Sequence, residues 1–156
     1  MARSAQKPKA SDHDLVLEEF LPYRLSILSN RVSRAIAARY AEEFDLTIPE
    51  WRVMALLGRH AQMTASEIAD ATEMDKVAIS RAVARLTEMR RVAGSPDPKD
   101  ARRQLLRLSA QGARIYAEIA PVALECERRL LSALSANEKA MLDGLIDRLL
   151  DGAKKL

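Results

Sequence analysis

The sequence predicts a mainly α-helical fold with one small β-hairpin. Its 156 residues include only five glycines and six prolines and are rich in alanine, leucine, arginine and glutamate, which favours helices. Three Ser/Thr-x-x-Glu capping boxes begin at Thr47, Thr64 and Ser135, and each marks a helix N-terminus. A break rich in glycine and proline, residues 94–98, is followed by an alternating apolar segment typical of a short strand.

Apolar residues at helical spacing define six helices. In the first, an apolar stripe runs from Leu21 to Tyr40 in steps of three or four residues. Asp75 is placed to cap the fourth helix and Ser109 the fifth. We expect helices over residues 48–59, 65–71, 76–90, 110–134 and 136–152, after a first helix that starts at Asp12 or Pro22 and ends at Phe44.

Composition excludes several classes of protein. No apolar run approaches the ~18 residues that span a membrane, so no membrane segment is expected. Residues 1–11 are expected to form a disordered basic tail without a secretory signal. The single cysteine, Cys126, excludes an internal disulfide and fits a cytoplasmic location. Cys126 lies on the apolar face of its helix, which favours a buried thiol. A redox switch is the alternative interpretation.

The sequence contains no recognisable enzyme chemistry. His13 and His60 are isolated, and neither a phosphate-binding glycine loop nor a nucleophile motif is present. We therefore expect no catalytic activity, no metal site and no cofactor.

Positive charge is concentrated in one segment. Between Asp75 and Arg107 there are nine basic and four acidic residues, a net charge of +5, whereas the whole chain carries +3. Such a local excess indicates a surface that faces a polyanion, although a charged loop alone is more often only a solvated surface.

The fourth helix has two distinct faces. Ile79, Val83 and Leu86 form an apolar stripe for the core. The opposite face carries small, hydrogen-bonding and charged side chains, namely Val77, Ser80, Arg81, Ala84, Arg85 and Glu88, with Lys76 at its N-terminal end. Arginine can donate two hydrogen bonds to guanine, serine can bond a base edge or a phosphate, and valine can touch a thymine methyl. For this helix alone, a solvated basic face is the alternative interpretation.

The third and fourth helices together have the apolar spacing of a helix-turn-helix. In this motif the first helix supports the second, which enters the major groove of DNA. Thr64 and Ser66 lie at the capped start of the supporting helix, where free backbone N–H groups can bind a phosphate.

With these motifs the chain resembles the MarR family of winged helix-turn-helix transcriptional regulators. The most specific match is "DARRQLLRLS", in which Asp100, Arg102, Leu108 and Ser109 match the family's Asp-x-Arg followed by Leu-Thr or Leu-Ser. "ISRAVARL" (79–86) resembles the recognition helix, and "LTIPEWRVMALL" (46–57) resembles the second helix. The resemblance covers roughly residues 20–150.

The resemblance implies a winged helix-turn-helix flanked by long N- and C-terminal dimerisation helices. Each subunit of an obligate homodimer would place one helix in the major groove and a wing arginine in the minor groove of a pseudo-palindromic operator. Many members release DNA when a small aromatic or phenolic ligand, or an oxidant, is sensed. The predicted function is therefore a dimeric, sequence-specific regulator, a repressor relieved by such a ligand. The alternative is a dimeric protein-interaction module without sequence-specific DNA binding.

The expected DNA-binding residues come from the start of the third helix, the fourth helix and the wing. Arg102 is the side chain expected in the minor groove, and Asp100 is suited to hold it. The full set is Thr64, Ser66, Lys76, Val77, Ser80, Arg81, Arg85, Asp100, Arg102 and Arg103.

The domain organisation follows from the same order of elements. Residues 47–108 are expected to form the DNA-binding lobe, and residues 12–46 and 109–156 a helical dimerisation lobe. The terminal helices have apolar stripes without an obvious partner in the central part, which predicts a two-fold homodimer. Its interface is expected to include Leu17, Phe20, Leu21, Leu130, Leu134, Leu142, Leu145 and Leu149.

A ligand pocket is expected between the two lobes. Its candidates are Tyr23, Arg24, Trp51 and His60, because an aromatic acid requires a ring partner and a cation. For Trp51 the alternative to ligand binding is packing in the core, and for His60 it is capping the end of a helix. Glu73 stands in the tight turn where the family commonly has glycine, so a mildly strained left-handed conformation is expected there.

Overall fold

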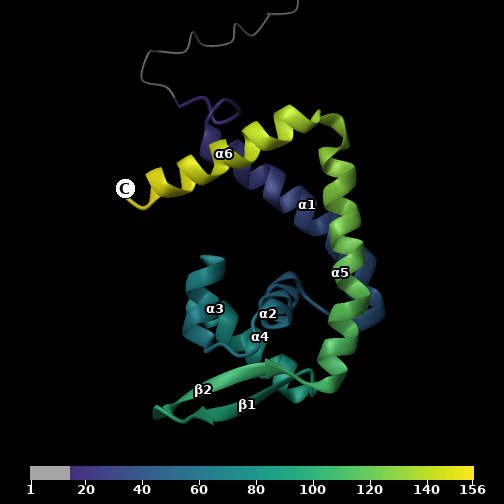
Figure 1. The fold of residues 1–156 in the computed structure, drawn as a ribbon, viewed down its shortest axis with the longest axis vertical. Helices are drawn as coiled ribbons and strands as arrows, with labels where there is room; N and C mark the ends of the chain where they lie inside the picture. Colours follow the sequence, from purple (N-terminus) through teal and green to yellow (C-terminus); the bar gives the residue numbers. More distant parts are fainter. Residues whose placement is uncertain (1–14) are drawn as a thin grey trace, which may run out of the picture.

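The computed structural model describes residues 15–156 and confirms a mainly helical fold with one β-hairpin (Figure 1). The expected basic tail and the Asp12 start of the first helix lie outside the described residues. None of the helices within 15–156 is long and apolar enough to cross a membrane. In chain order, the elements are α1 (Leu21–Phe44), α2 (Ile48–Arg59), α3 (Ala65–Thr72), α4 (Lys76–Glu88), β1 (Val92–Asp97), β2 (Asp100–Leu108), α5 (Ala110–Leu130), the 3-10 helix η1 (Leu131–Ala133) and α6 (Ala136–Ala153).

The helix starts follow the capping signals. All three predicted capping boxes form, at Thr47 before α2, Thr64 before α3 and Ser135 before α6. Asp75 accepts hydrogen bonds from two backbone N–H groups of α4, and Ser109 accepts one from α5. The largest boundary difference is at α5, which ends at Leu130 and is followed by η1, whereas one helix to residue 134 was expected.

One hydrophobic core joins the central elements to two of the long helices. Val53, Ile68 and Ile79, from α2, α3 and α4, are completely buried in it. Tyr40 of α1 and Ile119 of α5 are almost completely buried in the same cluster. The expectation that the α1 stripe lacks a partner in the central part is therefore wrong for its C-terminal half.

The N-terminal half of α1 has a different environment. Together with α6 and the end of α5 it presents large apolar side chains to solvent, among them Leu21, Leu28 and Leu149. A groove of about 680 Å³ between α1 and α6 is lined by Leu25, Leu28, Val32, Ile146, Leu149 and Leu150, among others. In Figure 1 this end of the molecule lies opposite the hairpin.

The hairpin is tied to the helices at its base. Strands β1 and β2 pair antiparallel, from Val92 opposite Leu108 outward, and Met63 forms an additional bridge with Leu106. Leu106 is buried and anchors the second strand in the core. The hairpin therefore projects from a fixed base while its tip extends into solvent (Figure 1).

A tight backbone junction connects α4, the hairpin and α5. Arg90 adopts a left-handed conformation with φ 56°, and its carbonyl accepts a hydrogen bond from the Ser109 hydroxyl at 2.6 Å. The neighbouring carbonyl of Arg91 accepts one from the Ser109 N–H at 2.9 Å. Gly112, in the first turn of α5, lies so close that an added Cβ would collide with the Arg91 carbonyl oxygen.

We predict that Gly112→Ala destabilises the protein by about 2 kcal/mol or more, because both sides of the collision are backbone and neither can rotate away. Gly152→Ala is the matched control, since nothing lies within 4 Å of a Cβ at that position. Alanine there is expected to leave stability unchanged or raise it slightly. Urea unfolding monitored by circular dichroism would measure both, and equal midpoints for the two variants would contradict the prediction.

Candidate nucleic-acid interface

The turn between α3 and α4 sets the direction of α4. Glu73 ends α3 in the left-handed conformation expected for it, with φ 51°. The Met74 N–H donates to the Ala69 carbonyl at 3.2 Å and closes the turn. Asp75 then starts α4 by accepting from the N–H groups of Val77 and Ala78 at 2.9 and 3.1 Å. This is the short, capped connection that a helix-turn-helix requires.

Helix α4 separates core and solvent faces as its sequence indicates. Ile79, Ala82 and Leu86 are buried against α2 and α3. The outer face carries exposed Lys76, Val77, Ser80, Arg81 and Ala84, and 54% of Val77 is accessible. A large apolar side chain exposed among basic and hydroxyl groups is suited to contact a thymine methyl in a groove.

At the hairpin tip, Asp100 and Arg102 form an ion pair. The Asp100 carboxylate accepts hydrogen bonds from the Arg102 backbone N–H at 3.1 Å and from its Nε at 3.2 Å. The Arg102 side chain is nevertheless 91% exposed. Asp100 thus orients the Arg102 side chain through its Nε and leaves its NH1 and NH2 groups in solvent.

The start of α3 lies beside strand β2. Ser66 is exposed, and a groove of about 260 Å³ there is lined by Thr64, Ser66, Arg103 and Gln104, among others. Gln104 is not among the residues predicted to bind DNA, although its place directly after Arg102 and Arg103 on the exposed strand was an available signal.

Thr64 was expected to contact DNA, but its environment differs from that of an exposed contact residue. It is buried, its N–H donates to the Glu67 carboxylate at 2.7 Å, and its hydroxyl accepts from the Glu67 N–H at 3.2 Å. The Thr64 hydroxyl also donates to this carboxylate at 2.9 Å. The two hydrogen bonds that Thr64 donates, from its N–H and its hydroxyl, lower the pKa of Glu67, and Arg103 contributes further. The polar groups of Thr64 are therefore occupied by the capping box, which removes it from the candidate DNA contacts and leaves Ser66.

Arg85 also differs from the other basic residues of α4. Its NH1 donates to both carboxylate oxygens of Glu50, at 2.8 and 2.7 Å, and its NH2 donates to Asp45 at 2.8 Å. Hydrogen bonds to Glu50 and then to Asp45 raise the pKa of Arg85. Because these partners lie 35 and 40 residues earlier in the chain, no local sequence pattern could have identified them.

A second arginine lies near the same carboxylates. Arg91 is 8% exposed, and its Nε and NH1 have no hydrogen-bond partner within the described part of the chain. Burial lowers the pKa of Arg91, while the charges of Asp45 and Glu50 act in the opposite direction. Arg91 is therefore part of the interior.

The four expected ligand-binding residues do not form one cavity within the subunit. Trp51 is half-buried and packs between Tyr40 and Tyr116, with ring centroids 5.7 and 6.0 Å away. His60 is exposed and caps the end of α2. Tyr23 lies 17 positions before Tyr40 on α1, roughly 25 Å along a helix. Trp51 and His60 therefore match the alternatives of core packing and a helix cap.

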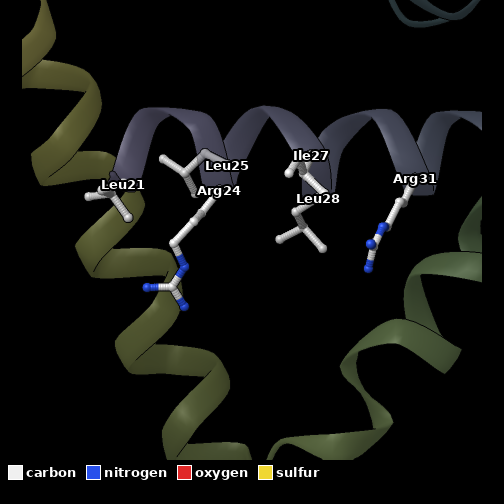
Figure 2. Close-up of a pocket in the computed structure, with 6 residues that line it drawn as sticks. All are labelled: Leu21, Arg24, Leu25, Ile27, Leu28 and Arg31. Atoms are coloured by element: carbon white, nitrogen blue, oxygen red, sulfur yellow. The ribbon is translucent and has the colours of Figure 1, made fainter. Parts of the chain in front are cut away.

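Arg24, in contrast, lines a groove on α1. The groove has a volume of about 420 Å³ and is lined by Leu21, Arg24, Leu25, Ile27, Leu28 and Arg31. Figure 2 shows Arg24 and Arg31 projecting from the same side of the helix as Leu21 and Leu28. Arg31 is not among the predicted ligand-binding residues, although it follows Arg24 by seven residues, two helical turns.

The residues expected at a dimer interface are mostly exposed. Leu17, Phe20, Leu21, Leu130, Leu145 and Leu149 are each 42–50% accessible, while Leu134 and Leu142 are half-buried within the chain. Cys126 is half-buried as well. Among residues 15–156, no group of three or more histidine, cysteine, aspartate or glutamate residues is arranged to hold a metal ion.

Comparison with known proteins identifies the fold and the family. The model of the MarR family matches residues 44–103, from the end of α1 to the middle of β2. A probable transcriptional regulator from Pseudomonas aeruginosa is 30% identical in sequence, and its crystal structure aligns with a TM-score of 0.71 over 85% of this chain and 98% of that chain. The chain belongs to the MarR family.

Two further proteins extend the comparison. The HTH-type transcriptional repressor NicR of Pseudomonas putida is 27% identical over 117 residues, which cover 75% of this chain and 74% of NicR. The MarR/EmrR family regulator from Acinetobacter sp. ADP1 has the same fold, with a TM-score of 0.82 and 23% identity over 91% of this chain and all of that chain. The MarR-family chain described here is thus a DNA-binding transcriptional regulator with a winged helix-turn-helix fold.

Proposed function

We propose that the protein is a dimeric, sequence-specific repressor that binds a pseudo-palindromic operator in double-stranded DNA and is released by a small aromatic effector. The observation that carries the proposal is the exposed face of α4 beside the exposed hairpin arginine. Val77, Ser80 and Arg81 are accessible on the helix, and Arg102 is accessible at the hairpin tip. A helix in the major groove with an arginine in the adjacent minor groove uses both features at once.

The proposed contacts divide into those that specify a base and those that position the protein. Arg81 would donate two hydrogen bonds to a guanine, and Val77 would touch a thymine methyl. Arg102 would enter the minor groove, where a narrow groove has enhanced negative potential. Lys76, Ser66 and Arg103, at the edges of this surface, would bind phosphates.

Dimerisation is proposed through the long helices. The exposed leucines of α1 and α6 and the groove between these helices form a contiguous apolar surface of the kind that a second copy would cover. In this arrangement residues 12–46 and 109–156 form the dimerisation lobe and residues 47–108 the DNA-binding lobe. The description of NicR as a transcriptional repressor supports repression as the direction of control.

An effector site is proposed in the groove around Arg24. Two guanidinium groups beside leucine side chains match a small aromatic carboxylate, which combines an apolar ring with a negative charge. Because α1 also carries the apolar surface proposed for the second copy, a ligand there would alter the distance between subunits and hence between their recognition helices.

The proposed DNA-binding role is tested by selection from random DNA followed by affinity measurements. We expect an enriched pseudo-palindrome with half-sites about one helical turn apart and an affinity that falls steeply with salt. Arg81→Ala should cost about 1–3 kcal/mol and relax the preference at one base pair. Arg102→Ala should weaken binding by removing the minor-groove contact. No enriched motif would favour the protein-interaction module instead.

The proposed dimer is tested by molar mass in solution. Leu149→Asp is expected to shift the wild-type dimer towards monomer, because the carboxylate would be buried without a partner in the interface. Val77→Asp is the control, since it adds the same charge to an exposed position on α4 and should leave the mass unchanged. Sedimentation velocity would report both, and a monomeric wild type would refute the proposal.

The proposed effector site is tested by thermal unfolding with benzoate and hydroxybenzoates. A ligand that binds only the folded protein raises its apparent stability, so at least one of these acids should raise the Tm. Arg24→Met should abolish the increase, whereas Arg34→Met, exposed on the same helix outside the groove, should retain it. An equal increase in both variants would place the ligand elsewhere.

A further inference from the structure

Arg85 lies at the meeting point of three elements. It belongs to the recognition helix α4, and its guanidinium contacts Glu50 in the first turn of α2 and Asp45 at the end of α1. We call these contacts the Glu50–Arg85–Asp45 bridge. Through Asp45, the bridge links α4 directly to the end of α1, the helix that carries the proposed dimer surface.

The Glu50 carboxylate is held in place by another bond, whereas for Asp45 it is the backbone that is fixed and the side chain is 75% exposed. The Glu50 side chain is only 4% exposed, and it also accepts the Thr47 N–H at 2.8 Å as part of the α2 capping box. Asp45 caps α1 in the left-handed conformation, with φ 48°, which fixes the direction in which the chain leaves the helix. Arg85 therefore connects a buried carboxylate at the start of α2 with the residue that caps α1.

The same contacts make Arg85 a poor ligand for DNA. Its NH1 and NH2 groups are both engaged, so a phosphate would have to displace Glu50, Asp45 or both. The two carboxylates would also repel a phosphate, and displacement would leave the buried Glu50 charge without its main partner. Arg91 adds positive charge nearby, but its Nε and NH1 make no hydrogen bond within residues 15–156, so the directional bonds come from Arg85.

We propose that Arg85 is a positioning residue, which fixes the orientation of α4 relative to α1 through the Glu50–Arg85–Asp45 bridge and thereby sets the half-site spacing that the dimer accepts. The inference rests on the proposed function for its link to operator spacing. Its structural part, the fixed angle between α4 and α1, applies to the protein without DNA.

The first experiment measures that angle without DNA. Nitroxide labels at Ala38→Cys on α1 and Ala84→Cys on α4, both exposed, would be introduced into full-length protein carrying Cys126→Ser. Electron paramagnetic resonance on labelled protein mixed with an excess of unlabelled subunits, so that each dimer carries one labelled copy, is expected to give a narrow distance distribution for otherwise wild-type protein. The distribution should broaden in Arg85→Met and in Glu50→Gln. It should stay narrow in Arg81→Met, which removes an equivalent charge four residues earlier on the same helix.

Glu50→Gln separates the bridge from helix capping, because glutamine at this position still completes a capping box. Arg85→Lys retains the charge but offers one ammonium group in place of the planar fork, so it should restore the distribution only in part. If both Arg85→Met and Glu50→Gln keep the narrow distribution, the positioning role is wrong, whether or not the protein binds DNA.

The second experiment uses operators whose half-sites are moved by one base pair in either direction. Wild type should lose roughly tenfold or more in affinity, because the second recognition helix then meets the wrong base edges. Arg85→Met and Glu50→Gln should bind the best operator about tenfold more weakly and discriminate less between spacings, and the double variant should be no weaker than Arg85→Met, as expected for one network. Arg81→Met should weaken binding at every spacing and keep the wild-type preference.

A DNA contact predicts a different outcome. Arg85→Met would then keep the spacing preference and reduce the salt dependence of binding by about one phosphate contact, while Glu50→Gln would bind like wild type. That result would overturn the proposal. Absence of operator binding by wild type would refute the proposed function, and the label distances would still decide the role of Arg85.

Discussion

The buried carboxylate of Glu50 is the constraint on which the arrangement of the interface depends. A charge removed from water must be paired and hydrogen-bonded, or its burial strongly destabilises the fold. Here the partners are the Thr47 N–H, which begins α2, and the guanidinium of Arg85, which belongs to α4. One side chain therefore fixes both the start of a supporting helix and the position of the recognition helix.

A second fixed point lies at the base of the hairpin. Arg90 adopts a left-handed conformation, and the Ser109 hydroxyl donates to its carbonyl while also capping α5. Gly112 allows α5 to begin against the backbone of Arg91. The mild strain at Arg90 is thus offset by contacts that orient the hairpin. Both exposed surfaces proposed to meet DNA, α4 and the hairpin tip, project from constrained bases.

The sequence predicted those features that local chemistry determines. Capping boxes, the left-handed Glu73 and the apolar face of α4 each depend on residues within a few positions, and the structure contains all of them. The features that the sequence did not reveal are contacts across the fold. The partners of Arg85 lie 35 and 40 residues away, and the C-terminal half of α1 packs on a core that only the folded chain creates.

These long-range contacts also reduce the positive charge that the segment from Asp75 to Arg107 can present to DNA. Nine basic residues lie between Asp75 and Arg107, but Arg85 is neutralised by two carboxylates and Arg91 is buried. Counterion release on DNA depends on the cations that reach phosphates, and not on the formal charge of the segment. The charge available to DNA is therefore smaller than the sequence count suggests, and it lies on the outer face of α4 and along the hairpin. Arg85 therefore serves to hold α4 in the position from which the exposed basic residues can reach DNA.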